Sequence, residues 1–523
     1  MHRCVKDYRM VGTLVAATAL ALGSHSPTIP GNAYALVQLT PAALCVETVP
    51  LLQAGATSVA PSLRVFRLPA ATARRLAPGL RARHALQTIE LDRDLAAASV
   101  RDTQPDPLEA AEWWRSVIGI EGLTPPGPGK PVTVVDSGID LQHPEFLNRP
   151  DTVALNPQEP APLGGRHGTA VASLVGAPRN GVGIVGVYPN AVIQSWDTAL
   201  GDGTVIDTSE VIRGITAAAD DAPGVINLSL GGTERDDLIE QAIDAAYAKG
   251  SLVVAASGND GDQGNPADYP ADYPHVLTVG ATDENNTVAP FSNRSPYVDL
   301  VAPGQNVTVA TADDASWEAE SGTSFSTPIV SGAAAWVWTA RPQLDNTQLF
   351  EMMRRSATDV PPAGHDDASG YGMLDVAAAL AYPAPVRDPF EPNDDVDFVQ
   401  PDSGFFSGLG PLTTRARQGA RLVARLDRLE DPVDAYRIWL PARKAVRVTA
   451  MSKANVALRV WGPGTVTVTE GQGPDLLGAD SRDRAGRKQV VVKPAPTGRW
   501  AYVEVTLGGR RGLVASYSLS VSR

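Results

Sequence analysis

The chain of 523 residues contains only two cysteines, Cys4 and Cys45. This number excludes a disulfide framework and a cysteine-rich zinc site. Beyond the N-terminal region the sequence has no run of 18 uninterrupted apolar residues, so we expect no membrane span. Aromatic residues make up only 6% of the chain, but hydrophobic residues as a whole reach 43%, which is typical of globular domains with large cores.

Basic residues are outnumbered by acidic residues, 44 against 58, which gives a formal net charge of −14. A deficit of this size argues against a general nucleic-acid-binding protein. The charge is distributed unevenly, because residues 105–383 carry −25, whereas residues 36–104 carry +3 and residues 384–523 carry +6. We interpret these changes of charge as domain boundaries.

The N-terminus is typical of an export signal. Three of the first nine residues are basic, and a mostly apolar stretch of 14 residues follows, from Met10 to Gly23. This stretch is too short to span a bilayer, and Ala33-Tyr34-Ala35 fits the rule for signal cleavage sites. We therefore predict a signal peptide over residues 1–35 and a secreted, extracellular protein. A buried N-terminal helix is the alternative.

Residues 36–104 have the pattern of a small α+β module. We expect strands over residues 62–68 and 85–91. Between them, residues 72–83 favour an arginine-rich helix, interrupted at Pro78-Gly79. A polar, proline-containing stretch ends this segment and predicts an exposed joint.

Residues 105–383 alternate apolar strands with helices of about a dozen residues, which predicts an α/β fold with a doubly wound, mostly parallel sheet. The expected strands cover residues 132–135, 192–196, 225–230 and 252–256, and the expected helices cover residues 169–175, 209–220 and 236–249. A proline-rich linker over residues 384–390 ends this domain.

Residues 391–523 change to the period-two alternation of strands, with no convincing helix. This pattern predicts an antiparallel, all-β sandwich. The expected strands cover residues 422–426, 435–440, 446–451, 457–461, 489–492, 501–506 and 516–521.

Three short motifs in the acidic segment carry chemical groups. Asp136 follows an apolar strand, at the edge of the sheet where ligands bind open α/β folds. His167, in Arg-His-Gly-Thr, stands at the start of a helix. Ser324, in Gly-Thr-Ser, precedes the apolar helical stretch of residues 329–340. Taken singly, each has an ordinary structural explanation: a strand-end turn, a structural histidine and a helix N-cap.

Taken together, an Asp, a His and a Ser in this order, each in a glycine-containing motif, resemble the subtilisin-like serine proteases, the subtilase family. The resemblance covers residues 105–383 and implies a serine endopeptidase that works through an acyl-enzyme intermediate. It implies that Ser324 is the nucleophile, His167 its general base and Asp136 the group that orients the imidazole. It also implies that Asn259, in Ala-Ala-Ser-Gly-Asn-Asp, stabilises the oxyanion.

The same resemblance implies that extended polypeptide substrates pair with backbone on two sides. The expected substrate-binding residues are Ser229, Leu230, Gly231, Ala256, Ser257 and Gly258. Asp268 precedes Tyr-Pro in a segment similar to the one that closes the primary specificity pocket of the family. A carboxylate there favours Lys or Arg, whereas an Asp268 turned to solvent leaves hydrophobic selectivity, and both interpretations stay open.

Subtilases also bind a structural calcium ion, and the resemblance implies that this site lies in the loop after the His167 helix. The implied ligands are the side chains of Glu145 and Asn180 and the backbone carbonyls of Pro178, Val182 and Ile184. A metal-free surface loop is the alternative, and no organic cofactor is expected.

The flanking segments have resemblances of their own. Residues 36–104 resemble a pro-segment that assists folding and inhibits the enzyme until it is cut, although a retained domain is the alternative. Residues 391–523 resemble bacterial pre-peptidase C-terminal domains. This resemblance is based on the motifs Glu391-Pro-Asn-Asp and Asp431-Pro-Val-Asp-Ala-Tyr. Such a domain serves in secretion or substrate attachment, or only stabilises the enzyme. We expect a monomer.

Two other functions compete with this interpretation. A sedolisin-type acid protease also has a Gly-Thr-Ser motif but uses a glutamate as base, which His167 in its His-Gly-Thr context argues against. The second competing function is that of a non-catalytic binding protein with a catalytically inactive subtilase fold. Ala170 and Phe325-Ser326 depart from common family residues, but neither departure removes a required group.

Overall fold

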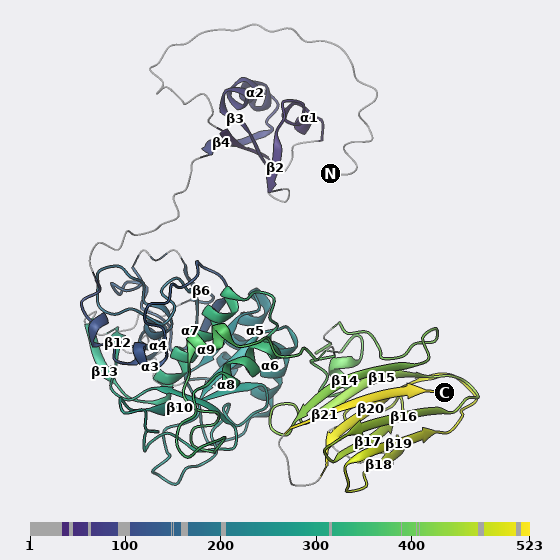
Figure 1. Ribbon diagram of the computed structural model, residues 1–523. Helices are drawn as coiled ribbons and strands as arrows, with labels where there is room; N and C mark the ends of the chain where they lie inside the picture. The colour runs from purple at the N-terminus through teal and green to yellow at the C-terminus, as the bar shows by residue number, and fades with distance from the viewer. Residues whose placement is uncertain are drawn as a thin grey trace, which may run out of the picture. The chain divides into compact units, whose positions relative to one another are not determined.

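The structure, a computed structural model, forms two compact units, Met1–Val100 and Arg101–Arg523 (Figure 1). Most of the predicted signal peptide lies outside the described residues, but Tyr34 and Ala35 begin the first strand. The structure describes residues 34–40, 45–60, 64–92, 105–147, 149, 151–157, 166–199, 206–312, 316–388, 390–403, 405–406, 408–468, 475–508 and 514–523.

The first unit is an antiparallel sheet of order β2-β3-β1-β4 with two helices. Helix α2 runs through Pro78 without interruption, so the predicted break is wrong. Ala73, Ala77 and Leu80 lie on one buried face of α2, and this packing outweighs the loss of one backbone hydrogen bond at the proline. The elements are β1 (Tyr34–Leu39), α1 (Cys45–Gln53), β2 (Thr57–Ala60), β3 (Val65–Pro69), α2 (Ala70–Ala82) and β4 (Leu86–Asp92).

The α/β domain of residues 105–383 is built on a seven-stranded parallel sheet of order β11-β10-β9-β8-β5-β7-β6, which confirms the predicted α/β class. Side chains of β5 alternate between two cores: Val132 and Val134 pack with α4 and α7, and Val135 packs with α5 and α6. The strands are β5 (Pro131–Asp136), β6 (Thr152–Ala154), β7 (Val192–Asp197), β8 (Val225–Leu228), β9 (Leu252–Ala256), β10 (Val276–Thr282) and β11 (Val298–Pro303).

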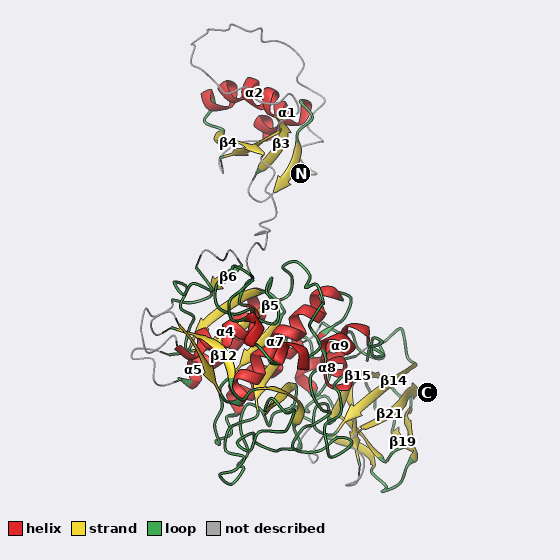
Figure 2. Ribbon diagram, turned by 60° about the vertical axis from the view of Figure 1, so that its left-hand side comes forward, coloured by secondary structure: helices red, strands yellow, loops and turns green. Residues whose placement is uncertain are grey.

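Helices therefore cover both faces of this sheet, and the long helix α7 lies against it (Figure 2). A separate hairpin pairs β12 (Val307–Thr311) with β13 (Ser316–Glu320). Within the described residues no helix is long and apolar enough to cross a membrane. The helices are η1 (Glu109–Ala111), α3 (Trp114–Val117), α4 (Arg166–Gly176), α5 (Thr208–Asp221), α6 (Asp237–Ala248), α7 (Thr323–Ala340), α8 (Asn346–Arg355) and α9 (Val376–Ala381).

The C-terminal domain consists of two four-stranded antiparallel sheets, β14-β21-β16-β19 and β15-β20-β17-β18. Their inner faces share one apolar core, as expected of a sandwich. The prediction missed β18 and the short helix α10 (Val396–Val399). The strands are β14 (Ala420–Asp427), β15 (Val433–Leu440), β16 (Val446–Ser452), β17 (Val456–Trp461), β18 (Leu476–Asp480), β19 (Gly486–Val492), β20 (Arg499–Leu507) and β21 (Val514–Ser522).

The sandwich and its linker contact the α/β domain directly. The backbone oxygen of Pro385, in the linker, accepts a hydrogen bond of 2.7 Å from Nε2 of Gln348 on α8. His275 stacks on Tyr247 of α6 at a centroid distance of 3.9 Å, and its Nε2 lies 3.3 Å from an oxygen of Asp394. The linker is therefore packed along the α/β domain.

Candidate active site

Asp136 is the last residue of β5 and is fully buried. Its Oδ1 accepts hydrogen bonds from the backbone N–H of Ser137 at 2.7 Å and from the Ser137 hydroxyl at 3.2 Å. Both carboxylate oxygens lie 2.9 Å from Nδ1 of His167. The apolar residues that precede it are buried on both faces of the sheet, so the carboxylate is held at the sheet's carboxyl edge.

His167 is the second residue of α4, and 40% of its side chain is exposed. Its ring centroid lies 5.8 Å from that of Phe325. Desolvation lowers the pKa of His167, but the charge and hydrogen bond of Asp136 and the charge of Glu320 together raise it by more, so the net pKa lies above its ordinary value. With Nδ1 engaged by Asp136, Nε2 is the ring nitrogen left to exchange a proton with a reacting group.

Ser324 is the second residue of α7, at the positive end of the helix dipole. The Ser324 hydroxyl donates to the backbone oxygen of Ser229 at 3.3 Å. The Ser229 hydroxyl in turn donates to the backbone oxygen of Ser324 at 2.8 Å. Within the described part of the chain, the Ser324 hydroxyl is therefore bonded to Ser229 and not to His167. Catalytic hydrogen bonds of this kind often form only when substrate is bound.

Asn259 follows strand β9 and is exposed. Its Oδ1 accepts hydrogen bonds from the backbone N–H and hydroxyl of Thr323, at 2.8 and 3.0 Å. These bonds hold the carbonyl side of the amide and leave its NH₂ group available as a donor. Asn259 lines one cavity of about 610 Å³ together with Asp136, His167 and Ser324, so the four predicted groups come together.

The predicted substrate-binding segments follow β8 and β9. Leu230 and Gly231 line the same cavity, whereas Ala256, Ser257 and Gly258 are buried. Gly232 and Tyr269 exchange backbone hydrogen bonds of 2.9 and 2.8 Å, which hold Asp268 beside Gly231.

Ser229 was predicted only as a substrate contact. Its hydroxyl also accepts a hydrogen bond of 3.0 Å from the Asn227 amide, whose oxygen in turn accepts one from Ser331 at 2.9 Å. This buried chain ties β8 to helix α7 beside Ser324. The sequence signal for this hydrogen-bond chain is the presence of two polar residues, Asn227 and Ser229, in an otherwise apolar strand segment.

Comparisons with known proteins agree with this geometry. Residues 127–372 match the family model described as the subtilase family. Subtilisin Savinase from Lederbergia lenta is 38% identical over 261 residues, which cover 49% of this chain and 92% of Savinase. The chain belongs to the subtilase family. Its peptidase domain is that of a serine endopeptidase.

Other known proteins are similar to about half of this subtilase. The alkaline protease of Alkalihalobacillus alcalophilus is 39% identical over 261 residues, which cover 49% of this chain and 65% of that protein. Among solved structures, the S41 psychrophilic protease matches with 28% identity and a TM-score of 0.45, over 52% of this chain and 99% of the other.

The loop implied as a calcium site contacts two buried carboxylates. Glu145 accepts hydrogen bonds at Oε1 from the backbone N–H of Ile184, at 2.9 Å, and from the indole of Trp317, at 2.8 Å. Its Oε2 is buried and has no partner among the described residues. Burial raises the pKa of Glu145 to about 8. Asn180 Oδ1 accepts from the backbone N–H of Val182 at 2.9 Å.

Asp106 is the second carboxylate, and the sequence analysis missed it. Its Oδ1 accepts three hydrogen bonds of 3.1 Å, from the backbone N–H groups of Asn180, Gly181 and Val182. Its Oδ2 is buried and has no described partner. Asp106 lies next to the polar joint at the start of the domain, where a carboxylate is ordinarily solvated, so no local pattern marks it.

Proposed function

We propose that this subtilase is a secreted endopeptidase that hydrolyses polypeptide chains through Ser324, His167 and Asp136. The observation that carries the proposal is the pair of 2.9 Å contacts from Asp136 to His167 Nδ1, in the cavity that Ser324 also lines. The sequence of residues 1–35 supports export.

The reaction begins when Ser324 Oγ attacks the carbonyl carbon of the substrate and His167 Nε2 takes the hydroxyl proton. Asp136 stabilises the resulting imidazolium. The NH₂ group of Asn259 and the backbone N–H of Ser324 donate to the oxyanion. Cleavage of the C–N bond transfers the proton from His167 to the leaving amine, and water then hydrolyses the acyl-enzyme by the same steps.

A fluorophosphonate probe tests this assignment. We expect the probe to label wild type at Ser324 and casein hydrolysis to fall to background in Ser324→Ala. Ser326→Ala is the matched control, because it removes another hydroxyl from the same motif, one that donates to the backbone oxygen of Ala302. This variant should keep both probe labelling and casein hydrolysis. An unlabelled wild type would support the non-catalytic binding protein instead.

We also propose that a structural calcium ion binds between Glu145 and the loop of residues 178–184. The buried oxygens Glu145 Oε2 and Asp106 Oδ2 support it, because they have no partner in the described part of the chain and buried carboxylate oxygens need a cation or a donor. Asn180 and the carbonyls of Pro178, Val182 and Ile184 complete the oxygen ligands that this ion prefers.

A chelator should lower the melting temperature of wild type, since an ion bound only to the folded state stabilises it. Glu145→Gln should melt at a lower temperature without chelator and respond less to it. An identical melting curve of wild type with and without excess chelator would contradict the calcium proposal.

We propose that residues 36–104 are a pro-segment that inhibits the enzyme, in which their +3 charge complements the −25 of the peptidase domain. Purified wild type should begin near residues 102–106, whereas Ser324→Ala should retain the segment. Equal N-termini in the two proteins would argue for a retained domain.

Residues 391–523 are proposed to be a pre-peptidase C-terminal domain of a monomeric enzyme.

A further inference from the structure

Two tryptophans lie side by side on the outer face of one sheet of the sandwich. Trp439 of β15 pairs across the strands with Trp500 of β20, and their ring centroids are 5.1 Å apart in an edge-to-face arrangement. Their neighbours in the strands, Ile438 and Ala501, belong to the apolar core between the two sheets. Because side chains alternate along a strand, both tryptophans face away from that core, and both are partly exposed.

An arginine stacks over each tryptophan ring. The guanidinium carbon of Arg415 lies 4.7 Å from the ring centroid of Trp439. That of Arg437 lies 4.1 Å from the ring centroid of Trp500. We call these four side chains the Arg–Trp row; in space they follow the order Arg415, Trp439, Trp500, Arg437. Stacking on an aromatic ring holds a guanidinium group in one plane and leaves the N–H groups at its edge available as donors.

The positive charge of the row is not neutralised by its own domain. In the part of the chain that the structure describes, no aspartate or glutamate pairs with Arg415 or Arg437, and Nε of Arg437 is buried without a hydrogen-bond partner. Glu504 is the one acidic residue at the outward positions of the described strands β15, β17 and β20. It already pairs with Arg459 and accepts a hydrogen bond from the indole of Trp461. An anionic ligand would therefore meet guanidinium groups that have no competing carboxylate.

The row lies beyond the part of the sheet that contacts the peptidase domain. Ala435, on the same outer face, packs with Val396 of helix α10 and with Tyr247 of the peptidase domain. Trp439 is four residues further along β15, which is about 13 Å at the rise of an extended strand. Residues 384–523 carry a net charge of +6. The sandwich thus presents a basic, aromatic surface at a distance from the acidic peptidase domain.

We propose that the Arg–Trp row is a binding surface for an acidic polysaccharide, whose sugar rings carry carboxylate or sulfate groups. The two guanidinium groups form charge-assisted hydrogen bonds with these anionic groups, because the planar donors of arginine match two oxygens at once. The indole rings contact the C–H faces of the sugar rings. This inference goes beyond the proposed peptidase function, because it gives the sandwich a ligand of its own and attaches the enzyme to an anionic matrix.

The tryptophans decide between two kinds of polyanion. A run of glutamates in a polypeptide would satisfy the two arginines, but it offers mobile side chains and no flat apolar surface for the indole rings. A charged sugar has C–H groups on one face of its ring and its anionic group at the edge. One unit of such a polymer can therefore contact a tryptophan and the arginine beside it together.

The test measures the binding of polygalacturonate, a polymer of sugar carboxylates, to the full chain at about 50 mM salt. All proteins carry Ser324→Ala, so that no chain is digested during the measurement. Arg415→Gln combined with Arg437→Gln should weaken binding at least about 10-fold, since two sets of charge-assisted hydrogen bonds are lost. The matched control, Arg447→Gln combined with Arg487→Gln, removes two exposed arginines from the outer face of the other sheet. It should weaken binding less than about 3-fold, because only long-range attraction is lost.

The aromatic half of the surface has its own test. Trp500→Leu, which keeps both arginines, should weaken binding at least about 3-fold. Equal effects of the two double variants, or full affinity in Trp500→Leu, overturn the proposal.

Two further polymers test the ligand class without any change in the surface. Dextran, a neutral polysaccharide, should not bind, and polyglutamate with the same number of charges should bind at least about 10-fold more weakly than polygalacturonate. Binding of dextran, or no binding of polygalacturonate, overturns the proposal. Equal affinities for polyglutamate and polygalacturonate overturn it in favour of an acidic protein partner. These comparisons keep the proposal falsifiable even if a variant does not fold.

Discussion

In the proposed mechanism, Asp136 acts through the orientation of the His167 ring. Both of its oxygens face Nδ1 of His167, so the ring proton stays on that nitrogen and Nε2 can accept the proton of Ser324. Ser137 donates two hydrogen bonds to the same carboxylate and holds it in place. The orientation of the His167 ring therefore depends on a carboxylate that Ser137 holds in place.

Asp136→Asn should lower kcat about 10⁴-fold, because an amide no longer favours the active tautomer. The acid limb of kcat/KM should also move to lower pH, since the carboxylate that raises the pKa of His167 is gone. Profiles from about pH 5 to about pH 9 on one peptide measure both effects. An acid limb at the wild-type pH would show that Asp136 does not act through His167.

The contact between Asp106 and the loop of residues 178–184 marks what the sequence could not reveal. Asp136, His167, Ser324 and Asn259 stand in short motifs, so their residue types could be predicted and the structure brings them to one cavity. Asp106 reaches its loop across 74 residues in a purely tertiary contact. Such a contact leaves no periodicity or turn signal in the sequence.

Helices α4 and α7 position the two side chains of the proposed reaction, because His167 and Ser324 are each the second residue of their helix. They approach closely at Gly332 of α7. A Cβ atom there would lie 2.8 Å from the backbone oxygen of Val175 in α4. The separation of the two helices is therefore set by a residue without a side chain, far from the chemistry.

Gly332→Ala should destabilise the enzyme by about 1–3 kcal/mol, the usual effect of overpacking a core. It should also reduce kcat, because the helices that carry His167 and Ser324 are forced apart. Gly127→Ala, where the added Cβ meets nothing within 4 Å, is the matched control. Thermal unfolding and peptide kinetics on both variants measure the effects, and normal kcat in Gly332→Ala would contradict the link.

Most strands could be predicted because apolar runs are long and bounded by turns, as in β9 (Leu252–Ala256), which was predicted without error. Two of the errors show local preference and packing in disagreement. Pro78 suggested a break in α2, but the buried face of the helix overrides it. Strand β18 (Leu476–Asp480) is weakly apolar and pairs only along one side, so its sequence carries little strand signal.

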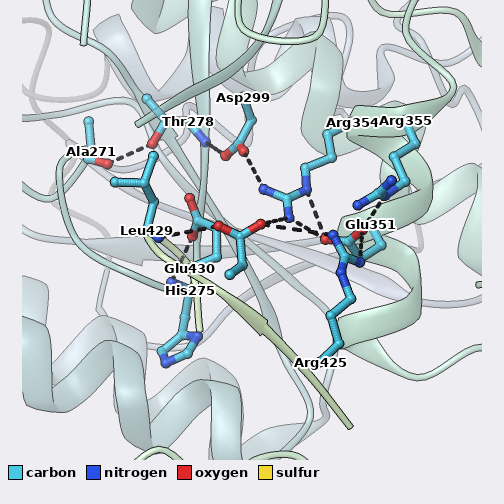
Figure 3. Close-up of polar contacts among 11 residues, drawn as sticks. Ala271, His275, Thr278, Asp299, Glu351, Arg354, Arg355, Arg425, Leu429 and Glu430 are labelled. Carbon is cyan, nitrogen blue, oxygen red and sulfur yellow. Dashed lines mark hydrogen bonds and ion pairs between the residues drawn. The ribbon is translucent and has the colours of Figure 1, made fainter. Parts of the chain in front are cut away.

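At the scale of the whole molecule, the peptidase domain and the sandwich share a buried charge network (Figure 3). Arg354 of α8 is 4% exposed and pairs with Asp299 at 3.3 Å and with Asp427 of the sandwich at 2.7 Å. It also pairs with Glu351, which Arg425 of the sandwich contacts at 2.6 Å. Breaking such a network leaves buried charges without partners.

Arg354→Met should therefore destabilise the protein by about 3–5 kcal/mol and loosen the sandwich. Arg355→Met is the matched control, because Arg355 is the next residue of the same helix, is one-third exposed and pairs only with Glu351 among the described residues. We expect it to cost about 1 kcal/mol or less. Thermal unfolding and limited proteolysis of the linker distinguish the two. Equal effects would show that the network does not join the domains.

The order of strands in the large sheet also has a consequence for how fast the chain folds. Val132 of β5 pairs with Val225 of β8, which is 93 residues further along the chain. The pairing of this central strand therefore depends on a segment that is distant in the sequence. In the N-terminal unit, Val37 pairs with Phe66 after only 29 residues. Contacts between nearby residues form sooner than distant parallel pairings. We therefore expect the N-terminal unit to be folded first during synthesis, while the catalytic sheet is still incomplete and its strand edges are exposed.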